Sequence, residues 1–196
     1  MKRAHLFLMF LLVGAISMIG MSMHYFLGED SGILAGKTFR ETWWYRLAFF
    51  LHIGGGLVAI STGPFQFMRN RKHWHVPLGY LYATSVGISS LAGLWIAPFA
   101  MGGWTAKVGF FILGLLWGGS LWLAMRALVQ RNLPRHRIWM LLNYALTFSS
   151  ITQRSILALA LITPISFITI YQVSAWLCWV LNLSIAASII HKTKIA

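Results

Sequence analysis

Apolar residues form six long runs that short polar segments separate. A helix needs about 20 mostly apolar residues to cross the hydrocarbon core of a bilayer, and each run has about that length. The pattern predicts transmembrane helices at 6–27, 45–67, 77–97, 106–128, 138–162 and 167–190. The predicted fold class is therefore all-α: a polytopic membrane protein with six transmembrane helices, in which helices two to five form a core four-helix bundle. Because the spans need nearly the whole chain, we expect residues 1–196 to form a single integral membrane domain.

The composition supports a membrane protein and argues against a nucleic-acid-binding one. Hydrophobic residues make up 58% of the 196 residues and charged residues 10%, whereas a soluble domain is about half apolar and about a quarter charged. The net charge is +13, but the basic residues lie in short clusters between the apolar runs and not along one face. We therefore expect no nucleic acid as a partner, and membrane lipids with anionic headgroups near the clusters.

The distribution of lysine and arginine predicts the topology, because cytoplasmic segments carry an excess of both. One alternating set of segments contains four: Lys37, Arg40, Arg46 and Lys107. The other set contains eleven: Lys2, Arg3, Arg69, Arg71, Lys72, Arg126, Arg131, Arg135, Arg137, Lys192 and Lys194. The imbalance predicts a multi-pass protein with both termini in the cytoplasm. The first run, which follows Lys2 and Arg3, is interpreted as an uncleaved signal anchor.

Tryptophans and acidic residues fit the same topology. Indole rings favour the headgroup level, and tryptophans flank the predicted spans at the outer boundary (Trp43, Trp44, Trp95, Trp104) and at the inner one (Trp74, Trp122, Trp139). The only acidic residues are Glu29, Asp30 and Glu41, all in the predicted external loop 28–44. Because no span contains a carboxylate, a proton-coupled transporter or pump is not favoured.

A weak internal repeat links two histidines. Helix two, a basic loop, His75 and helix three form one hairpin; helix four, a basic loop, His136 and helix five form another. Each returning helix is predicted to begin just after its histidine. We expect His75 and His136 to lie close together near the inner surface. They are either residues beside lipid headgroups or, in the inner leaflet, axial ligands of a metal, the iron of a haem, or a redox-coupled pair.

Polar residues at membrane depth are costly and therefore mark functional candidates. His52 and Arg154 are predicted at similar depths, about 10 Å and about 12 Å below the outer surface, facing a shared polar cavity that His24 could also reach. Each belongs to a helical face of small or polar residues. These faces are His52, Gly55, Ala59, Thr62 and Gln66 in helix two, and His136, Asn143, Thr147, Ser150 and Arg154 in helix five. We expect the two faces to meet inside the bundle.

Three consecutive glycines, Gly54, Gly55 and Gly56, follow His52 closely. Glycine weakens a helix by about 1 kcal/mol, so the run needs a reason. One reason is close packing of a neighbouring helix, and the other is a planar cofactor lying against the helix beside a ligating imidazole. The single cysteine, Cys178, lies in an apolar run and is interpreted as a small core residue.

Several short motifs resemble one known family. In chain order they are His52, Gly63-Pro64-Phe65-Gln66-Phe67, His75 before Gly79-Tyr80, His136-Arg137 before Trp139-Met140, and Thr152-Gln153-Arg154. The order resembles the bacterial predicted-membrane-protein family catalogued as domain of unknown function 2306. The resemblance covers residues 51–159, within core helices 45–162, and leaves helices one and six outside. It implies a polar set of His52, Gln66, His75, His136 and Arg154 but no activity, and Asn143 stands where the family usually has an arginine before tyrosine.

The leading hypothesis is a redox-related membrane protein that binds haem b or a quinone through this polar set. Imidazoles on different helices can ligate haem iron, and Arg154 could pair with haem propionates or with an oxygen of a small-molecule ligand. The alternative is a non-enzymatic assembly, scaffold or lipid-binding protein whose polar core fixes the bundle, and a third hypothesis is a small-solute transporter. No catalytic triad, carboxylate pair or phosphate loop favours a hydrolase or kinase, and whether the protein is an enzyme stays open.

The charge imbalance yields a direct test of topology. A cysteine at position 35 should react with a membrane-impermeant thiol reagent added outside intact cells, whereas cysteines at positions 132 and 194 should be protected. Labelling of position 132 from outside would overturn the predicted topology.

Overall fold

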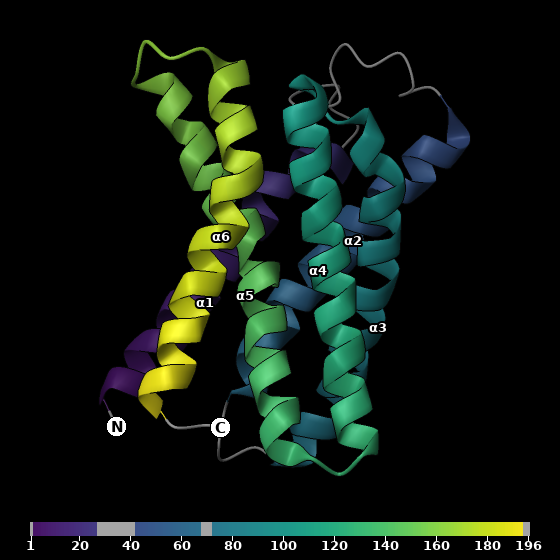
Figure 1. Cartoon of the computed structure of the whole chain (residues 1–196), viewed down its shortest axis with the longest axis vertical. Helices are drawn as coiled ribbons and strands as arrows, with labels where there is room; N and C mark the ends of the chain where they lie inside the picture. The colour runs from purple at the N-terminus through teal and green to yellow at the C-terminus, as the bar shows by residue number, and fades with distance from the viewer. Residues whose placement is uncertain (1, 27–41, 68–71, 194–196) are drawn as a thin grey trace. The chain divides into compact units, whose positions relative to one another are not determined.

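The computed structural model is all-helical over the residues that it describes, 2–26, 42–67 and 72–193. The order is α1 (Lys2–Phe26), α2 (Trp43–Gln66), α3 (Lys72–Ile96), η3 (Ala97–Phe99), α4 (Gly103–Val129), α5 (Leu133–Leu157), η4 (Ala158–Leu161) and α6 (Phe167–Thr193), where η marks short 3₁₀ helices (Figure 1). The prediction of an all-α chain with six long helices is confirmed. The external loop and its three acidic residues lie outside the described residues.

The chain divides into two compact units, Met1–Ala92 and Gly93–Ala196. The first unit contains α1, α2 and most of α3, and the second begins near the end of α3 and contains α4, α5 and α6. A core bundle of helices two to five would combine helices of both units, so that part of the fold stays a prediction.

Four helices among the described residues are long and apolar enough to cross a membrane: Trp43–Gln66, His73–Phe99, Gly103–Val129 and Phe167–Lys192. In α1 the apolar segment is Leu8–Met23, which is shorter. The α5 helix has 25 residues, but its polar face lowers its apolarity. On α4, Trp104 in the first turn is 81% exposed, and Trp122, seven residues before the helix end, is 60% exposed, as expected for indoles at the two boundaries of a bilayer.

Helices α3 and α5 begin earlier than predicted. They start at Lys72 and Leu133, so the expectation that each begins just after its histidine is wrong. At α5 the Asn132 side chain accepts a hydrogen bond from the Arg135 N–H at 3.1 Å, and a proline occupies the first turn; both features favour a helix start. His75 and His136 are each the fourth residue of their helix, so the equivalence between the hairpins is kept.

In the first unit, the glycine run brings α2 and α3 together. A Cβ atom added at Gly55 would lie 2.9 Å from the Ser85 carbonyl oxygen and 2.9 Å from the Ser89 Cβ, whereas a Cβ added at Gly54 would meet nothing within 4 Å. Close packing of α3 therefore explains why residue 55 is a glycine. At Gly55 the α3 backbone occupies the face of α2 on which a planar cofactor would have to lie. On α2, Phe49 also meets Tyr25 of α1 edge-to-face at 5.3 Å.

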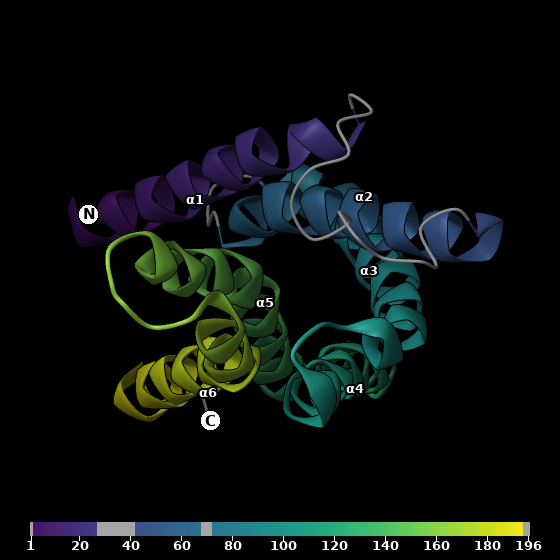
Figure 2. The same cartoon turned by 90° about the horizontal axis from the view of Figure 1, so that it is seen from above.

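In the second unit, α5 packs against both α4 and α6 (Figure 2). Close approach of α4 and α6 depends on Gly109, because an added Cβ would lie 2.9 Å from the Ala175 carbonyl oxygen. Cys178 is buried in α6, which agrees with a small core residue. The polar α5 helix is thus covered by two apolar ones.

The adjacent glycines of α2 give a matched test of packing. Gly55→Ala should destabilise the protein by about 1–3 kcal/mol, because the new methyl group must displace α3 backbone. Gly54→Ala should be neutral or stabilising by up to about 1 kcal/mol, since alanine favours helix and has room here. Reversible unfolding of both purified variants in detergent measures the difference, and equal stabilities would contradict close packing at Gly55.

Candidate functional site

His52 is held between α2 and α3 by two hydrogen bonds with Ser89. The His52 Nδ1 donates to the Ser89 carbonyl oxygen at 2.9 Å, and the Ser89 hydroxyl donates to the His52 carbonyl oxygen at 2.5 Å. A carbonyl oxygen only accepts, so the hydrogen of the neutral imidazole is on Nδ1 and the lone pair is on Nε2. Nε2 is the nitrogen that such an imidazole offers to a metal.

His136 has the same arrangement in the second unit. Its Nδ1 donates to the carbonyl oxygen of Ala124 on α4 at 2.9 Å, across the α4–α5 hairpin. The ring is half-buried, and its neutral form again carries the lone pair on Nε2. Two histidines on different helix pairs are therefore both fixed by a backbone carbonyl in the tautomer that metal-ligating histidines adopt.

His75 has the opposite tautomer. With the amide of Gln66 oriented to satisfy all its contacts, its nitrogen donates to the His75 Nδ1 at 2.9 Å and its oxygen accepts from the Gly79 N–H at 3.2 Å. An accepting Nδ1 leaves the hydrogen of the neutral ring on Nε2, so His75 presents a donor. The structure thus joins Gln66 and His75, two residues of the predicted polar set, in one hydrogen-bonded pair. A ligand role for His75 would require this contact to break.

Exposed tryptophans stand near both ends of α3. Trp74 and Trp95 are exposed and are separated by 21 residues, about 31 Å along a helix, which matches a hydrocarbon core of about 30 Å. Ser89, the partner of His52, precedes Trp95 by six residues, about 9 Å, and His75 lies next to Trp74. The depth of His52 in a membrane stays a prediction.

Arg154 lies near the end of α5. Hydrogen bonds pair Asn143 with Trp117 across α4 and α5, so 11 further residues place Arg154 level with Ala106, two residues from Trp104. Helix α5 ends at Leu157, short of the predicted end at residue 162. The depth of Arg154 in a membrane stays a prediction.

The polar face of α5 binds α4 through a buried network. Asn143 Nδ2 donates to the Trp117 carbonyl oxygen at 2.7 Å and to the Ser120 hydroxyl at 2.8 Å. The Trp117 indole N–H donates to the Thr147 hydroxyl at 2.8 Å. Ser150 donates to the Thr147 carbonyl oxygen, and Arg154 Nη1 donates to the Ser150 carbonyl oxygen at 3.2 Å. Within its own unit, the predicted polar face therefore serves helix pairing at Asn143 and Thr147.

Helix α6 contributes polar contacts that the sequence interpretation missed. Asn182 donates to the Ala145 carbonyl oxygen at 3.1 Å and accepts from the Thr152 hydroxyl at 3.1 Å. Gln172 donates to the Gly102 carbonyl oxygen at 2.8 Å, and the Trp176 indole to that of Thr105 at 2.9 Å. A lone asparagine in an apolar run was the available signal.

Neither predicted pair is brought together within one unit. His52 and His75 belong to the first unit, whereas Arg154 and His136 belong to the second, so the shared cavity and the proximity of the inner histidines stay predictions. Among the described side chains, no group of three or more His, Cys, Asp and Glu could hold a metal ion. His24 has no described side chain and stays a prediction as well.

Comparison with known proteins gives one match. A family model described as a predicted membrane protein, DUF2306, matches residues 49–190. The match includes most of α6, so the expectation that helix six lies outside the resemblance is wrong; the contacts of Asn182 and Gln172 give α6 a place among the same helices. No curated protein and no solved structure matches the chain.

Proposed function

The chain belongs to the DUF2306 family of predicted membrane proteins, and we propose that it is a redox-related member that binds haem b with His52 and His136 as ligands of iron. One observation carries the proposal. Both rings donate Nδ1–H to the backbone carbonyl of a neighbouring helix, at 2.9 Å in each case. A ring fixed in this way carries its lone pair on Nε2, and a hydrogen bond of this kind on the other ring nitrogen is usual for histidines that ligate a metal.

The residues present fit such a group in donor chemistry. Neutral imidazole is a common ligand of haem iron, which supplies one-electron transfer when bound. Ser89 and Ala124 act as positioning residues, because their carbonyl oxygens hold the two rings. The proposal places His52 at membrane depth and His136 near a boundary, so it assigns one imidazole to each level and leaves the second ligand at each level open.

His75 and Gln66 have a different role in this proposal. The Gln66 amide keeps the hydrogen on the His75 Nε2, which suits donation to an oxygen of a quinone and not ligation of a metal. Arg154 would bind an anionic group such as a haem propionate. Together with His52 and His136, these residues form the proposed cofactor-binding set.

The proposed location is the bacterial inner membrane, with both termini in the cytoplasm. The charge imbalance supports this orientation, because eleven lysines and arginines occupy one alternating set of segments and four the other. The labelling of positions 35, 132 and 194 tests it. In this orientation His75 and His136 would lie near the cytoplasmic surface.

A second candidate function, a non-enzymatic assembly or scaffold protein, has an observation of its own. Asn143, Trp117 and Asn182 use their polar atoms to bond one helix to another. A protein whose polar residues only stabilise its helices would need no cofactor. The two candidates differ in one property, because only the haem protein absorbs visible light.

An absorption spectrum of the detergent-purified protein, produced in cells supplied with a haem precursor, tests the proposal. We expect a Soret band that shifts on reduction. His136→Ala and His52→Ala should each reduce the band, because each removes an iron ligand. His75→Ala should keep it, as its tautomer does not suit ligation.

His191→Ala is the matched control, since His191 is exposed at the end of α6 and should leave the spectrum unchanged. A wild-type protein without bound haem would overturn the proposal and favour the scaffold. An unchanged band in His136→Ala would exclude His136 as a required ligand.

A further inference from the structure

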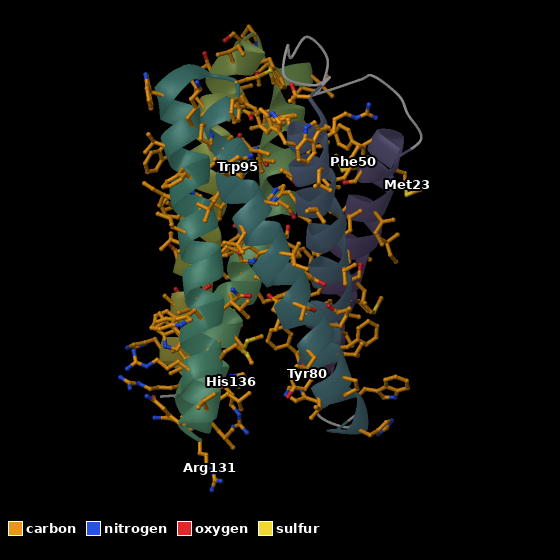
Figure 3. All side chains as sticks on the ribbon, turned by 90° about the vertical axis from the view of Figure 1, so that its right-hand side faces the viewer. Met23, Phe50, Tyr80, Trp95, Arg131 and His136 are labelled. Carbon is orange, nitrogen blue, oxygen red and sulfur yellow. The ribbon has the colours of Figure 1, made fainter. Side chains whose placement is uncertain are left out.

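The end of the α4–α5 hairpin carries four exposed arginines, Arg126, Arg131, Arg135 and Arg137. Figure 3 shows Arg131 at the tip of this hairpin and His136 further along it. Residues 93–196 contain no aspartate or glutamate, so no side chain of this unit can neutralise the arginines. Their counter-charge must come from outside the unit.

These arginines are arranged in register with two tryptophans. The Arg126 guanidinium lies 5.4 Å from the centre of the Trp122 ring. The bond between His136 and Ala124 sets the register of the hairpin and places Trp139 within one residue of the level of Trp122. By the same register, Arg135 is within one residue of the level of Arg126. Along each helix, the arginine is four residues, about 6 Å of helix rise, beyond its tryptophan.

This spacing matches the layers of a membrane surface. Indoles favour the boundary of the hydrocarbon core, and the headgroup layer extends about 5–8 Å further on each side. With Trp122 and Trp139 at the boundary, the backbone of Arg126 and Arg135 lies at the depth of the headgroup layer, within reach of the lipid phosphates. Guanidinium groups bind phosphate oxygens through two parallel hydrogen bonds.

The turn between the helices places a third arginine in an unusual conformation. Arg131 has φ 57°, and it is the only residue other than glycine with a positive φ among the described residues. The Arg131 N–H donates to the Leu128 carbonyl oxygen and the Asn132 N–H to that of Ala127, each at 2.9 Å. This is the Schellman motif, in which glycine is usual at the position of Arg131. The turn thus keeps an arginine where glycine would be less strained.

We propose that the hairpin end formed by Arg126, Arg131, Arg135 and Arg137 binds the phosphate group of an anionic phospholipid. Trp122 and Trp139 favour a lipid over free phosphate, because indoles at the boundary hold the neighbouring arginines at the depth of the lipid headgroups. The site does not depend on haem binding, since none of the four arginines belongs to the cofactor-binding set.

The test uses the full chain purified in an uncharged detergent. Phosphatidylglycerol, phosphatidylcholine and inorganic phosphate are added separately; bound lipid is counted by native mass spectrometry, and the midpoint of thermal unfolding is recorded for all three. We expect phosphatidylglycerol to bind and to raise the midpoint, more weakly as salt increases. Phosphatidylcholine and inorganic phosphate at equal concentration should have little effect.

Arg131→Gly separates lipid binding from folding. The glycine relieves the left-handed conformation, so the unfolding midpoint without lipid should be unchanged or higher. The affinity for phosphatidylglycerol should nevertheless fall about fivefold, the effect of about one cation near an anionic surface. Arg126→Gln combined with Arg131→Gly should lower the affinity about 25-fold, with the two effects adding.

Lys107→Gln is the control of equal charge, because Lys107 lies over Trp104 at the opposite end of α4. It should change the affinity less than twofold. Equal losses in Arg131→Gly and Lys107→Gln would overturn the proposal in favour of attraction to net charge alone. If inorganic phosphate stabilised the protein as much as phosphatidylglycerol does, the ligand would be a free anion and not a lipid. If phosphatidylcholine bound as well as phosphatidylglycerol, the charge of the lipid would have no role, and the proposal would be wrong.

Discussion

The hydrocarbon core of a membrane provides no hydrogen bonds, so a polar side chain on a transmembrane helix must find its partners within the protein. This constraint organises the second unit. Asn143 bonds a carbonyl oxygen and a hydroxyl of α4, and Asn182 bonds a carbonyl oxygen and a hydroxyl of α5. The least apolar helix, α5, accordingly packs against two apolar ones. Its polar face satisfies the constraint and selects its neighbours at the same time.

The same constraint gives the histidines their chemical identity. A ring nitrogen inside a helix pair bonds the nearest acceptor, which for both His52 and His136 is a backbone carbonyl oxygen of the neighbouring helix. That bond places the hydrogen on Nδ1 and leaves the lone pair on Nε2. His75 meets an amide donor instead, and its tautomer is reversed. The hydrogen-bond partner of Nδ1 therefore decides whether the Nε2 of a histidine can ligate a metal or can donate a hydrogen bond.

Much of this could be predicted from sequence, because periodicity and length depend on local chemistry. The six helices and the equivalent places of His75 and His136 in two hairpins follow from apolar runs and spacing. The role of Gly55 could not be separated from that of Gly54, since only the position of α3 distinguishes them. The predicted end of helix five was too late, because apolar residues 158–162 extend the hydrophobic run beyond the end of α5. Tautomers depend on partners in other helices, which spacing does not reveal.

A double-mutant cycle between Asn143 and Ser120, measured by reversible unfolding in detergent, tests the central claim most directly. If polar side chains bond α5 to α4, Asn143→Leu and Ser120→Ala should be coupled by about 0.6–1.7 kcal/mol, the range found for such contacts in membranes. Asn143→Leu and Ser184→Ala should show no coupling, because Ser184 is exposed and bonds the Val180 carbonyl oxygen of its own helix. The absence of coupling between Asn143 and Ser120 would contradict the account.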